Sequence, residues 1–285
     1  NIDITNNGKI TGIAGKKGVF GIYAVNDIAA YPTATSNIVH GATGSIDLSQ
    51  NEDSIGIYMA KGTLTSSGNI SVNNKSVGLD ATASNVTVSG GTHTIGKESV
   101  GFKLTNFAAT DKFLGNSGNI SMTDEKSVAY LLSGSNFTSN ANFKDDLTLA
   151  STKAYTYMSL INNSTLNYTN TKAIANDDSI FINTNASNVN LLTGTTVTST
   201  NKKVTGVYSE KSNVTNAGTL TLTGDNSSGI YAKSGSVVNQ AGGKITVGKD
   251  GSGIYVMAIG TPPVPGVGTN LGEITIGEGS VGMRA

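Results

Sequence analysis

The stretch at residues 243–255 reads GKITVGKDGSGIY and contains the pattern that decides the fold. In residues 243–247, Ile and Val alternate with Lys and Thr, and a period of two is typical of a strand with one buried face. A glycine-rich turn follows, and a second short strand begins at Gly253, where the glycine precedes an apolar residue and a tyrosine. A strand of four or five residues cannot bury an apolar face alone, so we expect this unit to repeat and to stack on its copies.

The glycine–apolar–tyrosine signal recurs along the chain. Clear copies begin at Gly21, Gly56, Gly206, Gly229 and Gly253. Looser copies begin at positions 78, 101, 129, 154, 180 and 282. Successive copies are mostly 22–29 residues apart, and most units also contain a Ser-x-Val strand and a Gly-x-Ile-x-Val strand. The repeat therefore contains three short strands separated by turns.

Three strands per repeat predict an all-β fold, namely a right-handed parallel β-helix (solenoid) of about eleven coils. Each strand would pair with its counterpart one coil away, at ~4.8 Å, and Ile, Val and Leu would form continuous inner columns. We expect Thr and Ser on the outer face, and Gly and Asn at the turns. The repeat signatures of leucine-rich repeats, β-propellers and RTX β-rolls are not present in the sequence.

We expect one solenoid over residues 1–285, as a segment of a longer passenger, because the pattern starts and stops without a polar capping repeat. Insertions at 25–43, 105–116 and 259–271 follow a first strand and are expected to protrude from one side. The coils in 140–205 are degenerate, and the pattern leaves their strand register open.

Composition excludes several functional classes. Gly, Thr, Ser and Asn number 36, 36, 31 and 31 of 285 residues, whereas Cys is absent and Arg284 is the single arginine. Lys plus Arg and Asp plus Glu are both 19, which does not fit the basic surface of a nucleic-acid binder. Without cysteine there is no disulfide framework and no Cys-based zinc site, and no apolar run is long enough for a membrane-spanning helix.

A carbohydrate-active β-helix enzyme, similar to a polysaccharide lyase or a glycoside hydrolase, is the alternative function. Such enzymes need a basic residue with an acidic Ca²⁺ cluster, or carboxylates that converge on one groove. The carboxylate pairs at 52–53, 124–125, 145–146 and 177–178 are expected in solvated turns. His40 falls in an insertion, and His93 is expected to face outward. No metal, cofactor or catalytic motif is present, so we predict a non-enzymatic protein without a cofactor.

A column of tyrosines is the first candidate partner-binding feature. In each Gly-Ile-Tyr copy the Ile should face inward and the Tyr outward, and Asp80, Lys103 and Arg284 take the outward place in other coils. The column comprises Tyr208, Tyr231 and Tyr255, with a second pair formed by Tyr23 and Tyr58. It could stack on sugar rings or anchor a protein, or it could be a cross-strand ladder that stiffens the sheet.

The insertions are the second candidate, because binding residues often lie on loops held by a rigid scaffold. Phe107 and Phe113 would either cap a groove or pack onto the coil. Pro262, Pro263 and Pro265 restrict the last insertion, which lowers the entropy lost on binding. A loop that is merely tolerated remains the competing interpretation.

The repeats at 216–232 and 243–255 resemble passenger domains of large fusobacterial autotransporter adhesins of the RadD-like family. The resemblance is specific over 1–130 and 206–285 and diluted over 140–205. It implies a type V secreted virulence protein on the cell surface, attached to the outer membrane by a C-terminal β-barrel outside this chain. It also implies adhesion to bacteria or host cells through a surface receptor or glycan, or a stalk that presents an adhesive tip. We expect a monomer.

Overall fold

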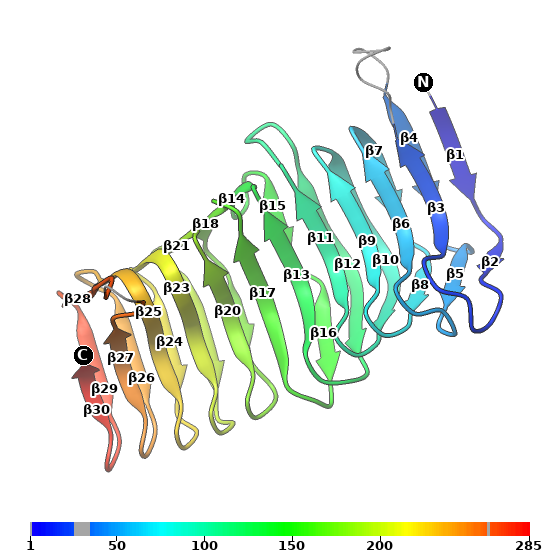
Figure 1. The fold of residues 1–285 in the computed structure, drawn as a ribbon. Coiled ribbons are helices and arrows are strands. Elements are labelled where there is room, and N and C mark those ends of the chain that lie inside the picture. The colour runs from blue at the N-terminus through cyan, green and yellow to red at the C-terminus, as the bar shows by residue number, and fades with distance from the viewer. Residues whose placement is uncertain (1, 26–34, 261–262) are drawn as a thin grey trace. The chain divides into compact units, whose positions relative to one another are not determined.

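The computed structural model describes residues 2–25, 35–260 and 263–285, and every regular element in these ranges is a β-strand (Figure 1). Two compact units are present, one formed by residues 1–136 and 140–153, the other by 137–139 and 154–285. Each is described separately. Pro262 and residues 26–34 of the first predicted insertion, 25–43, lie outside the described residues.

The first strands of the first unit form one parallel ladder. These strands are β3 (Phe20–Val25), β6 (Ile55–Ala60), β9 (Val77–Thr82), β11 (Val100–Thr105) and β13 (Ser127–Ser133). Their register joins Ile22, Ile57, Leu79, Phe102 and Tyr130 in one inward column. All five side chains are buried, so the apolar residue after each anchor position supplies the core, as the repeat predicted.

The second and third strands of this unit belong to a single ten-stranded sheet, because β10 and β12 run through both positions. The second strands are β1 (Ile2–Asn6), β4 (Ser36–His40), β7 (Gly62–Ser66), the start of β10 (Asn85–Ile95), the start of β12 (Phe113–Met122) and β15 (Phe143–Asp145). The third are β2 (Lys9–Thr11), β5 (Ser45–Leu48), β8 (Asn69–Val72), the ends of β10 and β12, and β16 (Thr148–Ser151).

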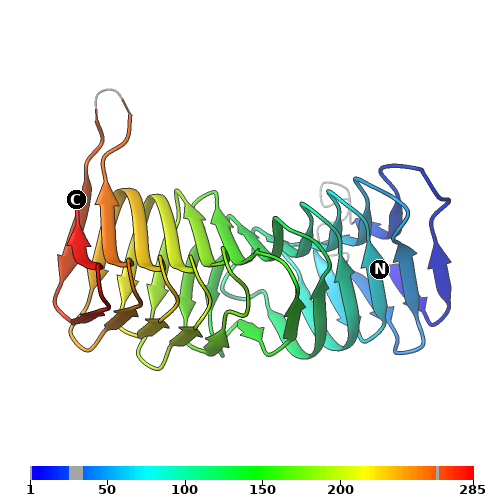
Figure 2. The same ribbon diagram turned by 90° about the horizontal axis from the view of Figure 1, so that it is seen from below.

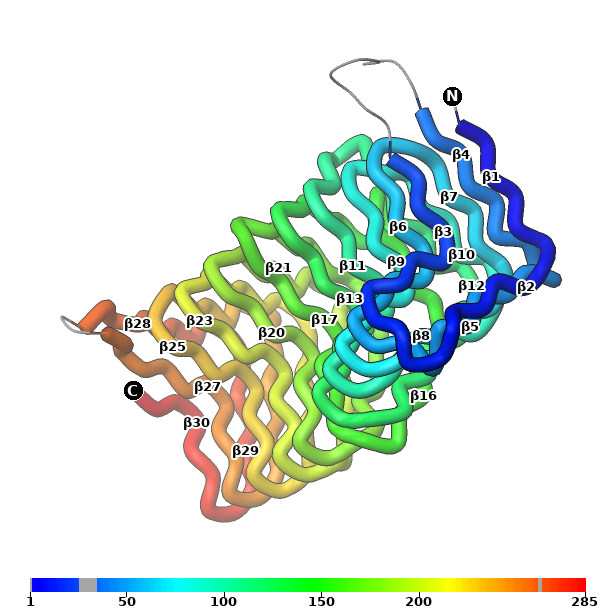
Figure 3. The backbone as a smooth tube through the Cα atoms, turned by 45° about the vertical axis from the view of Figure 1, so that its right-hand side comes forward, coloured from blue at the N-terminus to red at the C-terminus, as the bar shows by residue number. Residues whose placement is uncertain are grey.

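The second unit repeats this plan, and Figure 3 traces the backbone through its successive coils. Its first strands are β17 (Tyr155–Ile161), β20 (Ile180–Asn185), β23 (Thr205–Asn216), β25 (Ser228–Asn239), β27 (Ser252–Met257) and β30 (Val281–Arg284). The second are β14 (Asn136–Thr138), β18 (Thr165–Tyr168), β21 (Asn188–Leu191), the ends of β23 and β25, and β28 (Gly266–Asn270). The third are β19 (Thr171–Ala173), β22 (Thr196–Ser199), β24 (Thr219–Leu222), β26 (Lys244–Val247) and β29 (Glu273–Ile276).

The described strands confirm the predicted parallel β-helix and form about ten turns. The register in the degenerate region, which the sequence left open, is regular from β17 onward. Met158 pairs with Ile182, and Ile182 pairs with Val207, and all three are fully buried. The coils persist there because an inward column needs only apolar side chains of suitable size, not the Gly-Ile-Tyr signature.

Three serines lie in buried turns and not on the predicted outer face. Ser54, Ser76 and Ser99 lie at most 1% exposed, in the turn before the first strand of successive coils. The backbone N–H of Ser54 donates to Oγ of Ser76 at 3.0 Å, and that of Ser76 donates to Oγ of Ser99 at 2.9 Å. The expectation that Ser faces outward is wrong at these positions. The backbone N–H groups of a buried turn cannot bond to water, so they need a hydrogen-bond acceptor from the protein, and the serine hydroxyl groups supply it.

The anchor glycine is required by a close approach between coils. A Cβ atom on Gly229 would lie 2.5 Å from the carbonyl oxygen of Gly253 and 2.4 Å from Cγ2 of Ile245. Neither atom belongs to a flexible side-chain end, so a larger residue would push the coils apart. At Gly229 the glycine is thus a packing requirement rather than a turn signal.

Among the described residues, no helix has the length and apolar character needed to cross a membrane.

Candidate functional site

The three tyrosines of the second unit lie in register on the outer face of β23, β25 and β27. Tyr208 pairs with Tyr231, and Tyr231 pairs with Tyr255. The first two rings are stacked, with centroids 5.4 Å apart and planes 6° apart, whereas the second and third are edge to face at 4.9 Å. All three are partly exposed. We call this set the tyrosine row.

The faces of these rings are occupied by neighbours. Nζ of Lys233 lies 5.4 Å from the Tyr208 centroid, and the guanidinium of Arg284 lies 5.2 Å from that of Tyr255. A hydrogen bond with the Tyr208 hydroxyl raises the pKa of Lys233, so this amine stays charged at neutral pH. Stacking a sugar ring needs a free ring face. The geometry therefore favours the cross-strand ladder, in which the Tyr208 hydroxyl bonds with Lys233 and the Tyr231 hydroxyl donates to Sδ of Met257 at 3.1 Å.

The second tyrosine pair lies in the first unit. The rings of Tyr23 and Tyr58 are stacked at 5.1 Å, and Phe20 contacts both edge-on. The next coils place Asp80 and Lys103 in this column. Asp80 takes the outward place that the sequence predicted and pairs with Nζ of Lys103 at 2.8 Å, but it is only 2% exposed, so its carboxylate is not open to water. The long lysine stem covers the carboxylate instead.

The last predicted insertion forms a projecting hairpin. A backbone N–H···O pair, of 3.2 and 2.7 Å, links Ile259 with Val264 in an antiparallel bridge. The projection is visible beyond β27 in Figure 2. Regular pairing resumes with β28, so the insertion is shorter than the predicted 259–271. Val264 is 54% exposed, and Pro263 and Pro265 on either side of it are exposed as well.

The two phenylalanines of the second insertion are buried. Phe107 is 1% exposed, and its backbone N–H donates to Oγ of Ser135 at 3.1 Å. Phe113 is fully buried in β12 and packs against Phe102 and Phe143, with centroids 5.2 and 5.8 Å away. Both phenylalanines therefore pack onto the coil, and neither is exposed for a partner. The prediction that they are partner-binding residues is wrong. Removing their apolar surface from water into the coil lowers the free energy of the folded protein.

Both histidines lie in the core of the first unit, which corrects two expectations. His40 ends β4, within a regular strand rather than an insertion, and accepts a hydrogen bond from Asn6 and donates one to the Asn69 carbonyl, both at 3.1 Å. His93 is fully buried in β10. Positions 93 and 95 have the same parity, so His93 shares the inward face of Ile95.

The histidine environments suit packing rather than proton transfer. Burial lowers the pKa of His40, and it lowers the pKa of His93 to about 3. Neither ring nitrogen of His93 has a hydrogen-bond partner within the part of the chain that the structure describes. Its ring lies 4.8 Å from that of Phe102. A general acid or base must reach a substrate, and neither imidazole is exposed.

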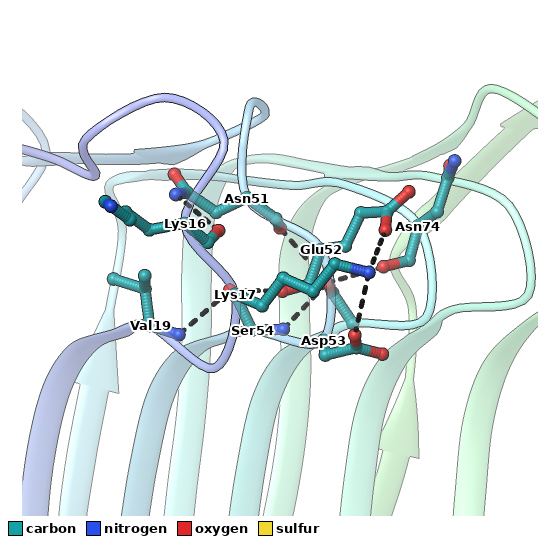
Figure 4. A network of polar contacts seen from close by, with 9 residues as sticks. Lys16, Lys17, Val19, Asn51, Glu52, Asp53, Ser54 and Asn74 are labelled. Carbon is teal, nitrogen blue, oxygen red and sulfur yellow. Dashed lines mark hydrogen bonds and ion pairs between the residues drawn. The ribbon is translucent and has the colours of Figure 1, made fainter.

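The carboxylate pair at 52–53 is held in an ion-pair network, drawn in Figure 4. Nζ of Lys17 lies 2.7 Å from Oε2 of Glu52 and 3.7 Å from Oδ2 of Asp53. The hydrogen bond with Lys17 lowers the pKa of Glu52, and the same contact raises the pKa of Lys17. An acid held ionised in this way is a poor proton donor at neutral pH.

The other carboxylate pairs also have separate structural contacts. Asp178 lies 3.7 Å from Lys203, and Glu125 lies 3.1 Å from Lys97. Asp146 lies 2.9 Å from Lys144, but Asp145 is buried in β15, so the expected turn position is wrong for that residue. Across the described ranges, no group of three or more His, Asp or Glu side chains is placed to hold a metal ion.

A groove that the sequence analysis did not predict lies on the outer surface of the second unit. It has a volume of about 320 Å³ and spans β19, β22 and β24 with the turns after them. Ala173 pairs with Thr198, and Thr198 pairs with Thr221, so the outward row goes from a small residue to larger ones. This size step is the signal that a comparison of aligned coils could have found. We call it the Ala–Thr groove.

Comparison with known proteins identifies a family. The family model described as the BigA third pectate lyase-like domain matches residues 85–285. Searches of curated proteins and of solved structures return no match.

Proposed function

Because the chain belongs to the family of the BigA third pectate lyase-like domain, we propose that it is a non-enzymatic adhesive domain at the bacterial cell surface. In the finer form of this proposal, it is a passenger segment of an autotransporter of the RadD-like type, secreted by the type V route and anchored to the outer membrane. It attaches the cell to other bacteria or to host cells. The parallel β-helix is a scaffold that hosts unrelated functions, so the surface features must support this choice.

One observation carries the proposal, namely the hairpin closed by the antiparallel bridge between Ile259 and Val264. It presents an exposed apolar residue, Val264, between two prolines at the end of a paired bridge. An exposed apolar side chain on a restricted loop is suited to protein recognition, because little conformational entropy is lost when it binds. The adhesive function therefore depends first on this hairpin.

The histidines and carboxylates support a non-enzymatic role. His40 and His93 are buried, and the carboxylate pair at 52–53 is held by Lys17. A lyase or hydrolase acting on a polysaccharide would need a base or an acid open to the substrate. The alternative, a carbohydrate-active enzyme, predicts cleavage of polyuronate by the purified chain.

Adhesion of bacterial and epithelial cells to surfaces coated with the purified chain tests the proposal. Val264→Asp should reduce the number of attached cells about fivefold or more, since the truncation of a central contact residue typically costs over 1 kcal/mol. Val267→Asp is the matched control, because Val267 is 56% exposed but lies in β28, outside the hairpin. Equal adhesion to the Val264→Asp variant and to the unaltered chain, or cleavage of polyuronate, would overturn the proposal.

A further inference from the structure

The Ala–Thr groove is lined by short side chains that differ between neighbouring coils. Ala173 and Ala175 are exposed on the coil of β19, whereas the next coils carry Thr198 and Thr200, and then Thr221 and Thr223. Because alanine lacks the Cγ and Oγ atoms of threonine, the two alanines leave a hollow in the surface. Its volume of about 320 Å³ lies at the lower end of the range for small-ligand sites.

The wall of the groove is held in place by side-chain hydrogen bonds. The carbonyl oxygen of Ile174 accepts a hydrogen bond from Oγ of Ser199 at 2.8 Å and a second from Nδ2 of Asn201 at 3.1 Å. Oγ1 of Thr223 donates to the Ser199 carbonyl at 3.4 Å. Threonine side chains on a strand are stiff at χ1, so the lining is ordered before a ligand arrives.

Free hydrogen-bonding groups remain in the groove. The hydroxyl groups of Thr198 and Thr221 make no hydrogen bond to any described residue, and Oδ1 of Asn201 has none either. The alanines and the threonine methyl groups provide apolar surface between these hydrogen-bonding groups. The groove thus offers donors, acceptors and small apolar patches in alternation, which complements a ring carrying both hydroxyl and C–H groups.

Charge complementarity decides against an ionic ligand. None of the described residues that line the groove has an ionisable side chain. Next to Asn201 in the chain, Nζ of Lys202 is paired with Asp225 at 3.4 Å, and the Asp177 carboxylate accepts a hydrogen bond from the Lys202 backbone N–H at 2.8 Å. An anionic or cationic ligand would give up its hydration without gaining an opposite charge.

We propose that the Ala–Thr groove is a binding site for a neutral saccharide, with a pyranose ring seated over Ala173 and Ala175 and hydrogen-bonded to Thr198 and Thr221. The site lies on the third strands, away from the hairpin sequence at 258–265, so it does not depend on the adhesive role of that hairpin. It gives this domain a glycan specificity of its own.

Binding of the purified chain to an array of neutral and acidic glycans tests this inference, followed by titration calorimetry with the glycans retained. Only neutral glycans should bind. Thr198→Val should weaken binding about three- to tenfold, the usual effect of one lost hydrogen bond. Ala173→Phe should fill the groove and abolish detectable binding.

Matched controls separate the groove from general effects on the fold. Thr246→Val removes a hydroxyl group from the same outward row, next to Thr221 but outside the groove, and should bind as the unaltered chain does. Ala150→Phe places the same large ring at an exposed position of β16, outside the groove. Val264→Asp should leave glycan binding unchanged even if it abolishes adhesion. Retention of no neutral glycan at millimolar concentration, equal retention of acidic ones, or full binding by Ala173→Phe would overturn the inference.

Discussion

His93 interrupts an apolar column of the first unit, and its replacement by isoleucine should stabilise the protein. In the register of the third strands, His93 lies between Ile70 and Ile120. It is fully buried, and neither ring nitrogen has a hydrogen-bond partner among the described residues. His93→Ile would continue the column with the residue that both neighbours already use.

The gain at neutral pH follows from the unpaired nitrogens. A buried polar group without a partner costs about 1–3 kcal/mol, and replacement by an apolar group of similar shape removes that cost. Residual misfit of the branched side chain against Phe102 would subtract up to about 1.5 kcal/mol. The free energy of unfolding at pH 7 should therefore rise, by about 1–2 kcal/mol.

The gain should become larger in acid. The pKa of His93 is about 3 in the folded protein, because burial penalises the imidazolium, against 6.5 for the ordinary side chain. Between these values the unfolded chain binds a proton that the folded chain does not, so stability is lost as the pH falls from 6.5 toward 3, by about 1.4 kcal/mol per pH unit. At pH 4.5 the penalty is about 2–3 kcal/mol, and His93→Ile abolishes it.

Urea unfolding followed by circular dichroism at pH 7 and at pH 4.5 measures both effects. The difference in unfolding free energy between the variant and the unaltered chain should be about 2–3 kcal/mol larger at pH 4.5 than at pH 7. Thr94→Ile, on the outer face of the same strand, is the control and should leave the pH dependence unchanged. An equal difference at the two pH values, or an imidazole of His93 that titrates near pH 6.5 by NMR, would refute the reasoning.

Three further substitutions test other packing arguments. Lys103→Met should destabilise the fold by about 3 kcal/mol, because it leaves the buried carboxylate of Asp80 without its cation. Ser76→Ala removes the acceptor of the buried Ser54 N–H and should cost about 1–3 kcal/mol. Gly229→Ala places a methyl group against the next coil and should cost about 1–3 kcal/mol. Thermal and urea unfolding measure all three.

Each of these has a matched control elsewhere in the chain. Lys17→Met removes an exposed ion pair and should leave the unfolding midpoint nearly unchanged. Ser71→Ala alters an outward serine of β8, and Gly8→Ala adds a methyl group at a position with no atom within 4 Å. If a core variant and its control shift the midpoint equally, the packing argument for that variant fails.

The local alternation of apolar and polar residues was enough to predict the strands of this protein. The inward residues of β6, β23, β25 and β27 follow directly from the Gly-Ile-Tyr copies, because a period of two places every second side chain on one face. The same rule places His93 on the inward face with Ile95, so the expectation that His93 faces outward is wrong.

Residue type was a weaker guide where the coils interact. Serine is common in turns and on surfaces, yet Ser76 is buried because its hydroxyl group accepts the N–H of the neighbouring coil. Phe113 falls in a sequence insertion, yet it is core because Phe102 and Phe143 lie next to it in space. Ser76 lies 22 residues after Ser54, and Phe143 lies 30 residues after Phe113, so no local pattern reveals these contacts.

By itself, the sequence determined the repeat, the three strands of each coil and the apolar columns, because these depend on spacing along the chain. Only the tertiary structure decided which polar groups are sequestered, which tyrosine faces are covered and where the surface is hollow. Asp80, His93 and the Ala–Thr groove show why. Each depends on the difference between one coil and the coil stacked on it, and that difference acquires a physical meaning only when the register is known.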